Sequence, residues 1–299
     1  PSWVLVLALL NGMLRPSDMV MRQALVGDTV PQSSLANALG LTRISMDSAR
    51  VFGALVGAGI FEALGIAYAY ILVSAVYLLA FLLSFGVTNT HDYATKAILA
   101  KSSQWKDFKE GIAYIWSTPA VLAIMALAVI TNLTAFPIIR GLLPYVAKEV
   151  YLITEIGLGH MIATFSFGAM IGSTIIAVAG ARTHSTKFML SNILLWYVML
   201  AVFAAMGDKF NGLISLFVMG IVHALGMVSM SVILVGQLET HMRGRVIGVR
   251  ILAIYGVPIG LMGTSYFINV IGFQGTVNLY VALGIAVTTL IWFKWRKAL

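Results

Sequence analysis

The sequence predicts an all-α membrane protein, a bundle of nine transmembrane helices, and three observations predict it. Of the 299 residues, 60% are hydrophobic and 10% are charged, whereas an ordinary soluble domain has about 25% charged residues. Nine continuous apolar runs are long enough to span the hydrocarbon layer, which takes roughly 20 helical residues. The first of these runs carries a polar stripe, which indicates an interior that holds protein or water rather than lipid.

The first predicted span, 3–24, places four polar residues on one helical face, because they recur at intervals of four, three and four positions: Asn11, Arg15, Asp18 and Arg22. A charge that faces lipid is costly, so this face must look inward. Asn11 and Arg15 are therefore candidates to line a substrate cavity. Asp18 lies one turn from an arginine on either side, which favours an ionised, paired carboxylate over a proton carrier.

The remaining spans are predicted at 42–63, 66–86, 119–139, 156–179, 187–206, 211–235, 247–270 and 276–294. The second span repeats the charged spacing of the first, with Arg43, Asp47 and Arg50 at i, i+4 and i+7. Together with Asp18 and Arg22 they are candidates for a charge cluster that holds the helix bundles in one state. The alternative is a plain anchor at the membrane surface.

Fourteen of the nineteen Lys and Arg residues fall on one side of this arrangement. By the positive-inside rule that side is cytoplasmic, and the C-terminus lies there too. The net charge of +8 is spread between apolar spans, which indicates membrane topology rather than a surface that binds nucleic acid. A multi-pass protein of the inner (cytoplasmic) membrane is expected.

The only long polar connection, 87–118, divides the chain into a partial N-terminal bundle of three spans (1–86) and a C-terminal six-helix bundle (119–299). Within the connection, SQWKDFKEGIAYIW places Trp105, Phe108, Ile112 and Ile115 on one helical face. This pattern predicts an amphipathic helix on the cytoplasmic membrane surface. A solvated linker is the alternative.

Glycine spacing predicts close helix packing at three places. The pairs Gly53 and Gly57, Gly168 and Gly172, and Gly256 and Gly260 each have small residues four apart, which lets two helix backbones approach. A shift of 207 residues superposes Arg43 on Arg250, Gly53 on Gly260 and Gly65 on Gly272. The shift indicates a faint internal repeat, of a kind found in several transporter folds.

Single polar residues in or near the spans are further candidates to line a cavity: Asn132, His160, His223 and Gln237. A hydrogen bond between helices is the alternative for each. Arg140 would either bind an anionic substrate or reach the outer headgroups. Arg243 and Arg245 are candidates for the charge cluster or for anchors between bundles. The chain has no cysteine, no GxxxxGK[ST] and no HExxH, and its histidines are far apart, so no enzyme, metal site or cofactor is expected.

Several motifs, in this order along the chain, carry a family resemblance: RPSDMVMRQALVGDTVPQSSLANALGL (15–41), SARVFGALVGAGIFEALG (48–65), KEGIAYIWSTPAVLAI (109–124), IRGLLPYVAKEV (139–150), FGAMIGSTIIAVAGAR (167–182) and RGRVIGV (243–249). The chain resembles the major facilitator superfamily, and within it the enterobactin-exporter-like efflux permeases (transmembrane secretion effectors). The resemblance implies that the nine spans correspond to helices 4–12 of twelve. A piece of a longer protein that lacks the first three helices is expected.

The resemblance also implies a function. Proteins of this family open a central cavity alternately to the two membrane faces by rocking one bundle against the other. The expected protein is a monomeric efflux permease that moves a small organic molecule across the bilayer, driven by an ion gradient, with protons as the expected ion. A non-transporting receptor or scaffold of the same fold and a passive facilitator are the alternatives.

Overall fold

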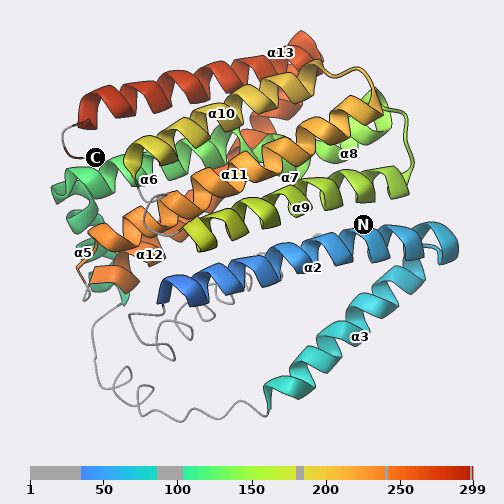
Figure 1. Cartoon of the computed structure of the whole chain (residues 1–299), viewed down its shortest axis with the longest axis horizontal. Helices are drawn as coiled ribbons and strands as arrows, with labels where there is room; N and C mark the ends of the chain where they lie inside the picture. Colours follow the sequence, from blue (N-terminus) through green and yellow to red (C-terminus); the bar gives the residue numbers. More distant parts are fainter. Residues whose placement is uncertain (1–34, 86–103, 180–184, 240–241, 297, 299) are drawn as a thin grey trace.

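The computed structural model describes residues 35–85, 104–179, 185–239, 242–296 and 298, and all regular elements in that part are helices or helical turns (Figure 1). In chain order the elements are α2 (Leu35–Leu64), α3 (Ile66–Ser84), α5 (Gln104–Ser117), α6 (Pro119–Thr134), α7 (Phe136–Gly141), α8 (Leu143–Tyr145), the π-helical turn η2 (Val146–Val150), α9 (Glu155–Ala179), α10 (Thr186–Ala205), α11 (Lys209–Gln237), α12 (Arg243–Leu252), the 3-10 turn η5 (Ala253–Tyr255) and α13 (Gly256–Trp295). The predicted span 3–24 lies outside the described residues.

Seven segments of the described chain are long and apolar enough to cross a membrane. Six of them coincide, within a few residues at most ends, with one predicted span each, and the seventh, Arg243–Trp295, covers the last two predicted spans. At 1.5 Å per residue its 53 residues would form a rod of about 80 Å, far longer than a bilayer is thick. The segment therefore has to fold back on itself.

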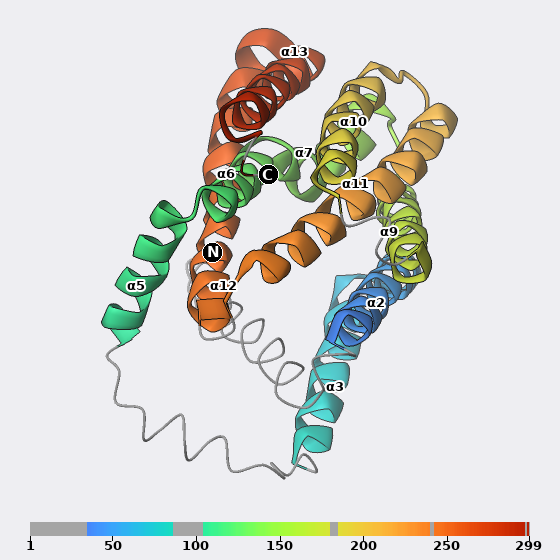
Figure 2. The ribbon, with the colours of Figure 1, turned by 60° about the vertical axis from the view of Figure 1, so that its left-hand side comes forward.

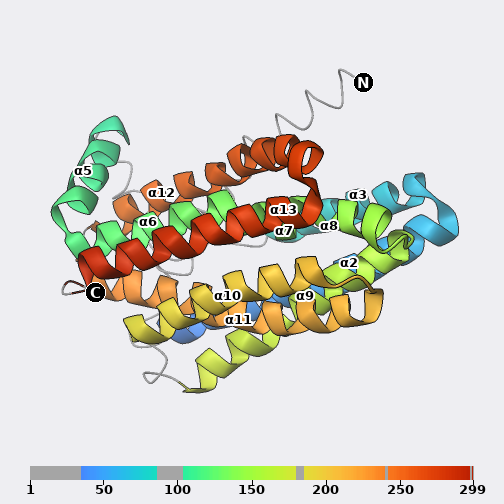
Figure 3. The same ribbon diagram turned by 90° about the horizontal axis from the view of Figure 1, so that it is seen from above.

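Gly272 makes that reversal within α13. Its φ of 74° and ψ of 174° belong to a backbone region that is essentially restricted to glycine. The two arms then lie side by side, because the Tyr280 hydroxyl donates a hydrogen bond of 2.7 Å to the Gly260 carbonyl, twenty residues away. Figure 3 shows this helical hairpin from above.

Gly65 makes the same turn between α2 and α3. Its φ of 87° and ψ of 172° nearly equal those of Gly272, and these two are the only glycines with positive φ in the described part of the chain. The two residues superpose under the 207-residue shift of the internal repeat. The weak repeat in sequence thus has a counterpart in backbone geometry.

The predicted span 119–139 is a broken helix rather than a straight one. Pro137 has no backbone N–H to donate to Leu133, and its ring clashes with that carbonyl, so the helix breaks between α6 and α7. The apolar segment then continues through α8 and η2 to Val150. Pro258 has a similar effect, because the 3-10 turn η5 includes Ile254, the residue whose carbonyl it would have used.

The helices form a continuous row of neighbours. Helix α2 packs against α9, α9 against α11, and α11 against α10, while α13 packs against both α10 and α6, and α12 against α5. Figure 2 shows α2 and α3 on one side of the molecule and α5, α6 and α12 across from them. The largest fully buried side chains include Trp196 and Tyr197 of α10 and Ile124 of α6, which places the core in the C-terminal unit of α6 to α13.

Glycines bring α9 and α11 into backbone contact. A Cβ added at Gly168 would overlap the Phe217 carbonyl, one at Gly172 would overlap the Ile221 carbonyl, and one at Gly220 of the facing helix would overlap the Phe165 carbonyl. Gly260 is equally confined, because a Cβ there would overlap the Leu133 carbonyl beside the ring of Pro137. The carbonyl that Pro137 leaves without its helical donor therefore lies against a glycine of α13.

Candidate substrate cavity and gate

The candidate cavity residues are not gathered in one place. His160 is exposed near the start of α9, and Gln237 is exposed at the end of α11, and these helix ends lie at opposite ends of the bundle (Figure 1). Asn132 is half-buried in α6, where its side-chain amide donates a hydrogen bond of 2.8 Å to the Ala128 carbonyl and where its Cβ borders Gly256. Asn11 and Arg15 lie outside the described residues.

His223, in the middle of α11, lies inside a group of aromatic rings. It is 3% exposed, and its ring centroid lies 4.7 Å from that of Trp196, 5.3 Å from Phe165 and 5.5 Å from Phe136. These rings come from α7, α9 and α10. The Arg140 guanidinium lies 4.3 Å from the centroid of the Phe136 ring. This distance suits a cation–π interaction.

Sequence reasoning identified His223 and Arg140 separately but missed the three rings between the helices. The aromatic residues are 29, 31 and 60 positions apart in pairs along the chain, so no spacing rule would group them. What the cluster offers chemically is an imidazole that can accept a proton and three π-faces that stabilise a cation.

Two charges near the middle of α2 form an ion pair on the α9 side of the helix. Asp47 is fully buried, and the Arg50 guanidinium donates to its carboxylate at 2.8 Å while remaining 44% exposed. The neighbouring Ser48 hydroxyl approaches the Met170 sulfur of α9 at 3.3 Å. Of the other candidates for this cluster, Asp18 and Arg22 lie outside the described residues, and Arg43 is described only as a backbone position of α2.

Arg245 ties α12 to the linker helix α5. It forms ion pairs of 2.7 Å with Asp107 and 2.9 Å with Glu110. Gly111 of α5 lies against the same turn, since a Cβ there would be 3.1 Å from the Arg245 carbonyl. Arg243 begins α12 and is half-buried. Among the described residues, Arg245 thus anchors α5 to α12, and a role of Arg243 and Arg245 in the charge cluster or between bundles stays a prediction.

Around Gly159, the interface between α2 and α9 is built from small residues. A Cβ added at Gly159 would be 2.6 Å from the Ala58 methyl group and 2.9 Å from the Ala54 carbonyl. By contrast, no atom of the described residues lies within 4 Å of a Cβ at Gly53 or Gly57. The close approach predicted for α2 therefore occurs at Gly159 of the partner helix, because the alanines of α2, not its glycines, face α9.

Two ionisable groups at the opposite end of the bundle from α5 each keep one protonation state near neutral pH. The pKa of Tyr151 is raised to about 12 by burial and, to a lesser extent, by the nearby negative charge of Asp208. The pKa of Asp208, which caps α11, is lowered by hydrogen bonds from the backbone and side chain of Asn211. Near neutral pH the phenol is therefore neutral and the carboxyl ionised, so neither group suits proton transfer.

Within the described ranges, no group of three or more His, Asp or Glu side chains gathers in a way that would hold a metal ion.

Comparison with protein families matches residues 1–151 to the model of the Major Facilitator Superfamily. A search among curated proteins finds no match.

Proposed function

The chain belongs to the major facilitator superfamily of membrane transporters, and on that premise we propose that it is a secondary active transporter that exports a small organic molecule across the cytoplasmic membrane. A proton gradient would drive the export. The chain would work by alternating access, in which one group of helices rocks against the other and opens a central site to each membrane face in turn.

The observation that carries this proposal is the α2–α9 interface. It joins the N-terminal helices to the C-terminal unit, and at Gly159 its contacts are to a methyl group and a backbone carbonyl. Small residues present few interlocking side chains, so two helices packed this way can shift against each other with little repacking. Long side chains that interdigitate would resist the same motion.

The candidate residues fit distinct roles in such a transporter. The Asp47–Arg50 pair would hold α2 in one of the two states, as a gate. His223 and its aromatic neighbours, which face the inside of the C-terminal unit, would offer a proton-accepting group. Asn132, half-buried in α6, would offer hydrogen bonds to a substrate, as would Asn11 and Arg15 of the predicted first span.

Collapse of the proton gradient is expected to stop export. A strain that lacks the protein would first be screened against a panel of toxic organic compounds, and a compound whose toxicity rises would serve as the probe. Cells that express the full-length protein should keep the probe out, and an uncoupler should raise its accumulation to the level of the deletion strain. Accumulation is measured directly with radiolabelled probe.

Other outcomes of this experiment point to other functions. Continued equilibration of the probe after the gradient is collapsed, with no accumulation against it beforehand, would indicate a passive facilitator. A deletion strain that shows no changed sensitivity, and purified protein in vesicles that moves none of the panel, would indicate a receptor or scaffold of the same fold.

The substitution Gly159→Val is expected to reduce transport at least tenfold while the protein still reaches the membrane. The new side chain would push α9 away from Ala54 and Ala58 and obstruct the sliding contact. The same substitution at Gly57, where the described structure leaves open space, is the matched control and should retain most activity. Equal transport rates in the two variants, normalised to surface protein, would contradict a sliding role for this interface.

A further inference from the structure

Arg140 is directed back along its own helix rather than toward the membrane surface. It is the penultimate residue of α7, which ends at Gly141. Its guanidinium nevertheless lies over the ring of Phe136, one helical turn earlier, with 4.3 Å between the guanidinium carbon and the ring centroid. An arginine that reached for the outer headgroups would extend past the end of the helix. Of the two roles that the sequence leaves open for Arg140, this direction favours binding of an anion.

The ring under Arg140 is fixed by its neighbours. The centroid of the Phe136 ring lies 5.1 Å from that of Trp196 and 5.5 Å from that of His223, and these three side chains are buried. Arg140 itself is exposed. A cation–π contact thus holds an exposed guanidinium on a ring that close packing keeps in place. A binding group whose position is set in advance loses less conformational entropy when a ligand arrives.

Helix lengths place this aromatic group near the middle of the bilayer. Trp196 is nine residues from the end of α10, Phe165 ten residues from the start of α9, and His223 fourteen residues from the start of α11. These three helix ends lie at the same end of the bundle (Figure 1). At the helical rise the three rings are about 14–21 Å from those ends, and the centre of the hydrocarbon layer is about 15 Å from its surfaces.

The span that carries Arg140 is broken next to it. Because of Pro137, α7 is a separate short helix within the apolar segment Pro119–Val150. Secondary transporters commonly build their substrate sites near the bilayer midplane on such discontinuous helices. An arginine within a membrane span is by itself a candidate for a substrate pathway, because its burial there is costly. The depth, the charge and the break in the backbone therefore indicate the same function.

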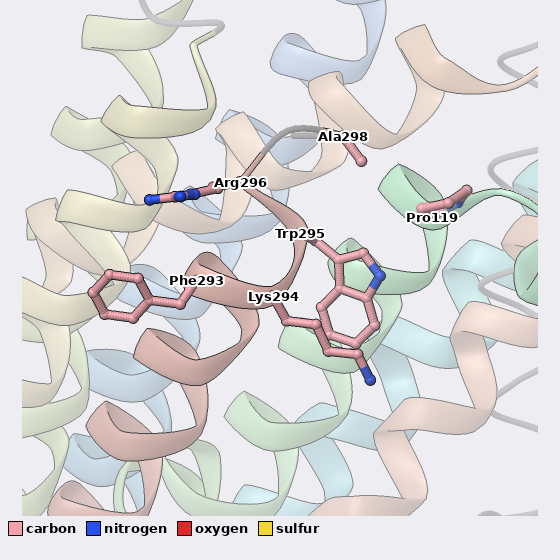
Figure 4. A pocket seen from close by; sticks show the side chains of 6 residues that line it. All are labelled: Pro119, Phe293, Lys294, Trp295, Arg296 and Ala298. Atoms are coloured by element: carbon pink, nitrogen blue, oxygen red, sulfur yellow. The ribbon is translucent and has the colours of Figure 1, made fainter.

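The hollow at the end of α13 does not gather its side chains in a comparable way. It has a volume of about 460 Å³, and its described lining includes two cations, Lys294 and Arg296. Figure 4 shows the Phe293 and Arg296 side chains on one side of the helix end and the Trp295 indole on the other. The Lys294 ammonium lies over that indole, so the two cations do not face one ligand.

We propose that Arg140 binds the charged group of the transported molecule, and that this molecule is an organic anion with a carboxylate group. The inference rests on the proposed transport function, for which it names the substrate class. A guanidinium is planar and donates two parallel hydrogen bonds to the two oxygens of a carboxylate. The Phe136 ring holds that planar group at the depth where the substrate site is expected.

The proposal is tested by binding to the full-length protein in phosphatidylcholine nanodiscs, with the signal of empty nanodiscs subtracted. Isothermal titration compares benzoate, 1-naphthoate and octanoate with the primary alcohol and the ammonium compound of the same carbon skeleton. The wild type should bind at least one carboxylate tenfold or more tightly than its alcohol and ammonium analogues. Arg140→Gln should bind that carboxylate roughly 10- to 100-fold more weakly and lose the preference. Arg140→Lys should keep the preference at reduced affinity, because lysine retains the charge but not the planar fork.

Lys148→Gln is the matched control, since it removes an exposed cation from the same apolar segment and should bind as the wild type does. The proposal is overturned if Lys148→Gln and Arg140→Gln weaken binding equally, if the wild type binds none of the carboxylates or binds the analogues as tightly, or if Arg140→Gln keeps the preference. If Arg140→Gln does not fold, Arg140→Lys decides: its carboxylate affinity should fall at least threefold, and an unchanged affinity overturns the proposal.

The binding measurement separates this inference from the proposed export function, because it needs no gradient. A protein that binds carboxylates through Arg140 but fails the uncoupler experiment would keep the anion site and lose the coupled export. A protein that passes the uncoupler experiment but binds no carboxylate would keep the export and lose the assigned substrate class.

Discussion

Replacing Gly220 with valine is expected to lower the amount of folded protein in the membrane several-fold. A Cβ at this position already overlaps the Phe165 carbonyl, and Gly168 and Gly172 of the facing helix are closed in by the backbone of α11 in the same way. A backbone carbonyl inside a helix cannot turn aside as a side chain does, so α9 and α11 would have to separate. Overpacking of this kind typically costs about 1–3 kcal/mol and occasionally more, a large share of a total stability of roughly 5–15 kcal/mol.

The measurement is the amount of monodisperse protein after detergent extraction, together with its unfolding temperature. Gly236→Val supplies the control, because it makes the same change in the same helix at a position where no atom of the described residues lies within 4 Å of a Cβ. The control should resemble the wild type. Comparable losses in both variants would show that valine in α11, rather than contact with α9, causes the defect.

The substitution Arg50→Ala is expected to have the second-largest effect. It removes a guanidinium 2.8 Å from the Asp47 carboxylate, which is fully buried. Removing one member of a buried ion pair typically costs about 3–5 kcal/mol. Because Arg50 itself is 44% exposed, water reaches one side of this pair, and a cost of about 2 kcal/mol is expected. Both transport and thermal stability should fall.

A double variant separates the cost of the buried Asp47 charge from the loss of its pairing with Arg50. Asp47→Ala/Arg50→Ala removes the buried carboxylate along with its partner, so it should be more stable than Arg50→Ala alone. If the pair is also a gate, the double variant will regain stability but not the wild-type transport rate. Transport at the wild-type rate in both Arg50→Ala and Arg43→Ala, at equal surface expression, would exclude a gating role for these charges. Anchoring at the membrane surface would then be their role.

The sequence predicted the spans well because each depends on a local property. A run of about 20 apolar residues must be a helix in a bilayer, since the backbone there has to satisfy its own hydrogen bonds. The predicted spans also leave Gly65 and Gly272 between neighbouring helices, and the repeat superposes these two residues. It did not foresee that the span 119–139 would break, although Pro137 is the signal that an inspection for helix-breaking residues would have used.

The candidate site was harder to predict because it depends on which helices become neighbours. The packing of α2 on α9 brings Gly159 into a close contact, whereas Gly53 and Gly57 have none with the described residues. The aromatic surroundings of His223 come from three other helices. Arg245 carries two ion pairs because α12 lies beside α5. None of these partners is marked by local periodicity.

The single-glycine reversals at positions 65 and 272 bear on how the chain enters the membrane. A loop of one residue offers no hydrophilic tail that could be drawn across the bilayer after the first helix has already settled there. Each helix would therefore partition into lipid together with its partner, as a helical hairpin. During biosynthesis, α2 with α3, and the two arms of α13, would leave the insertion machinery as pairs.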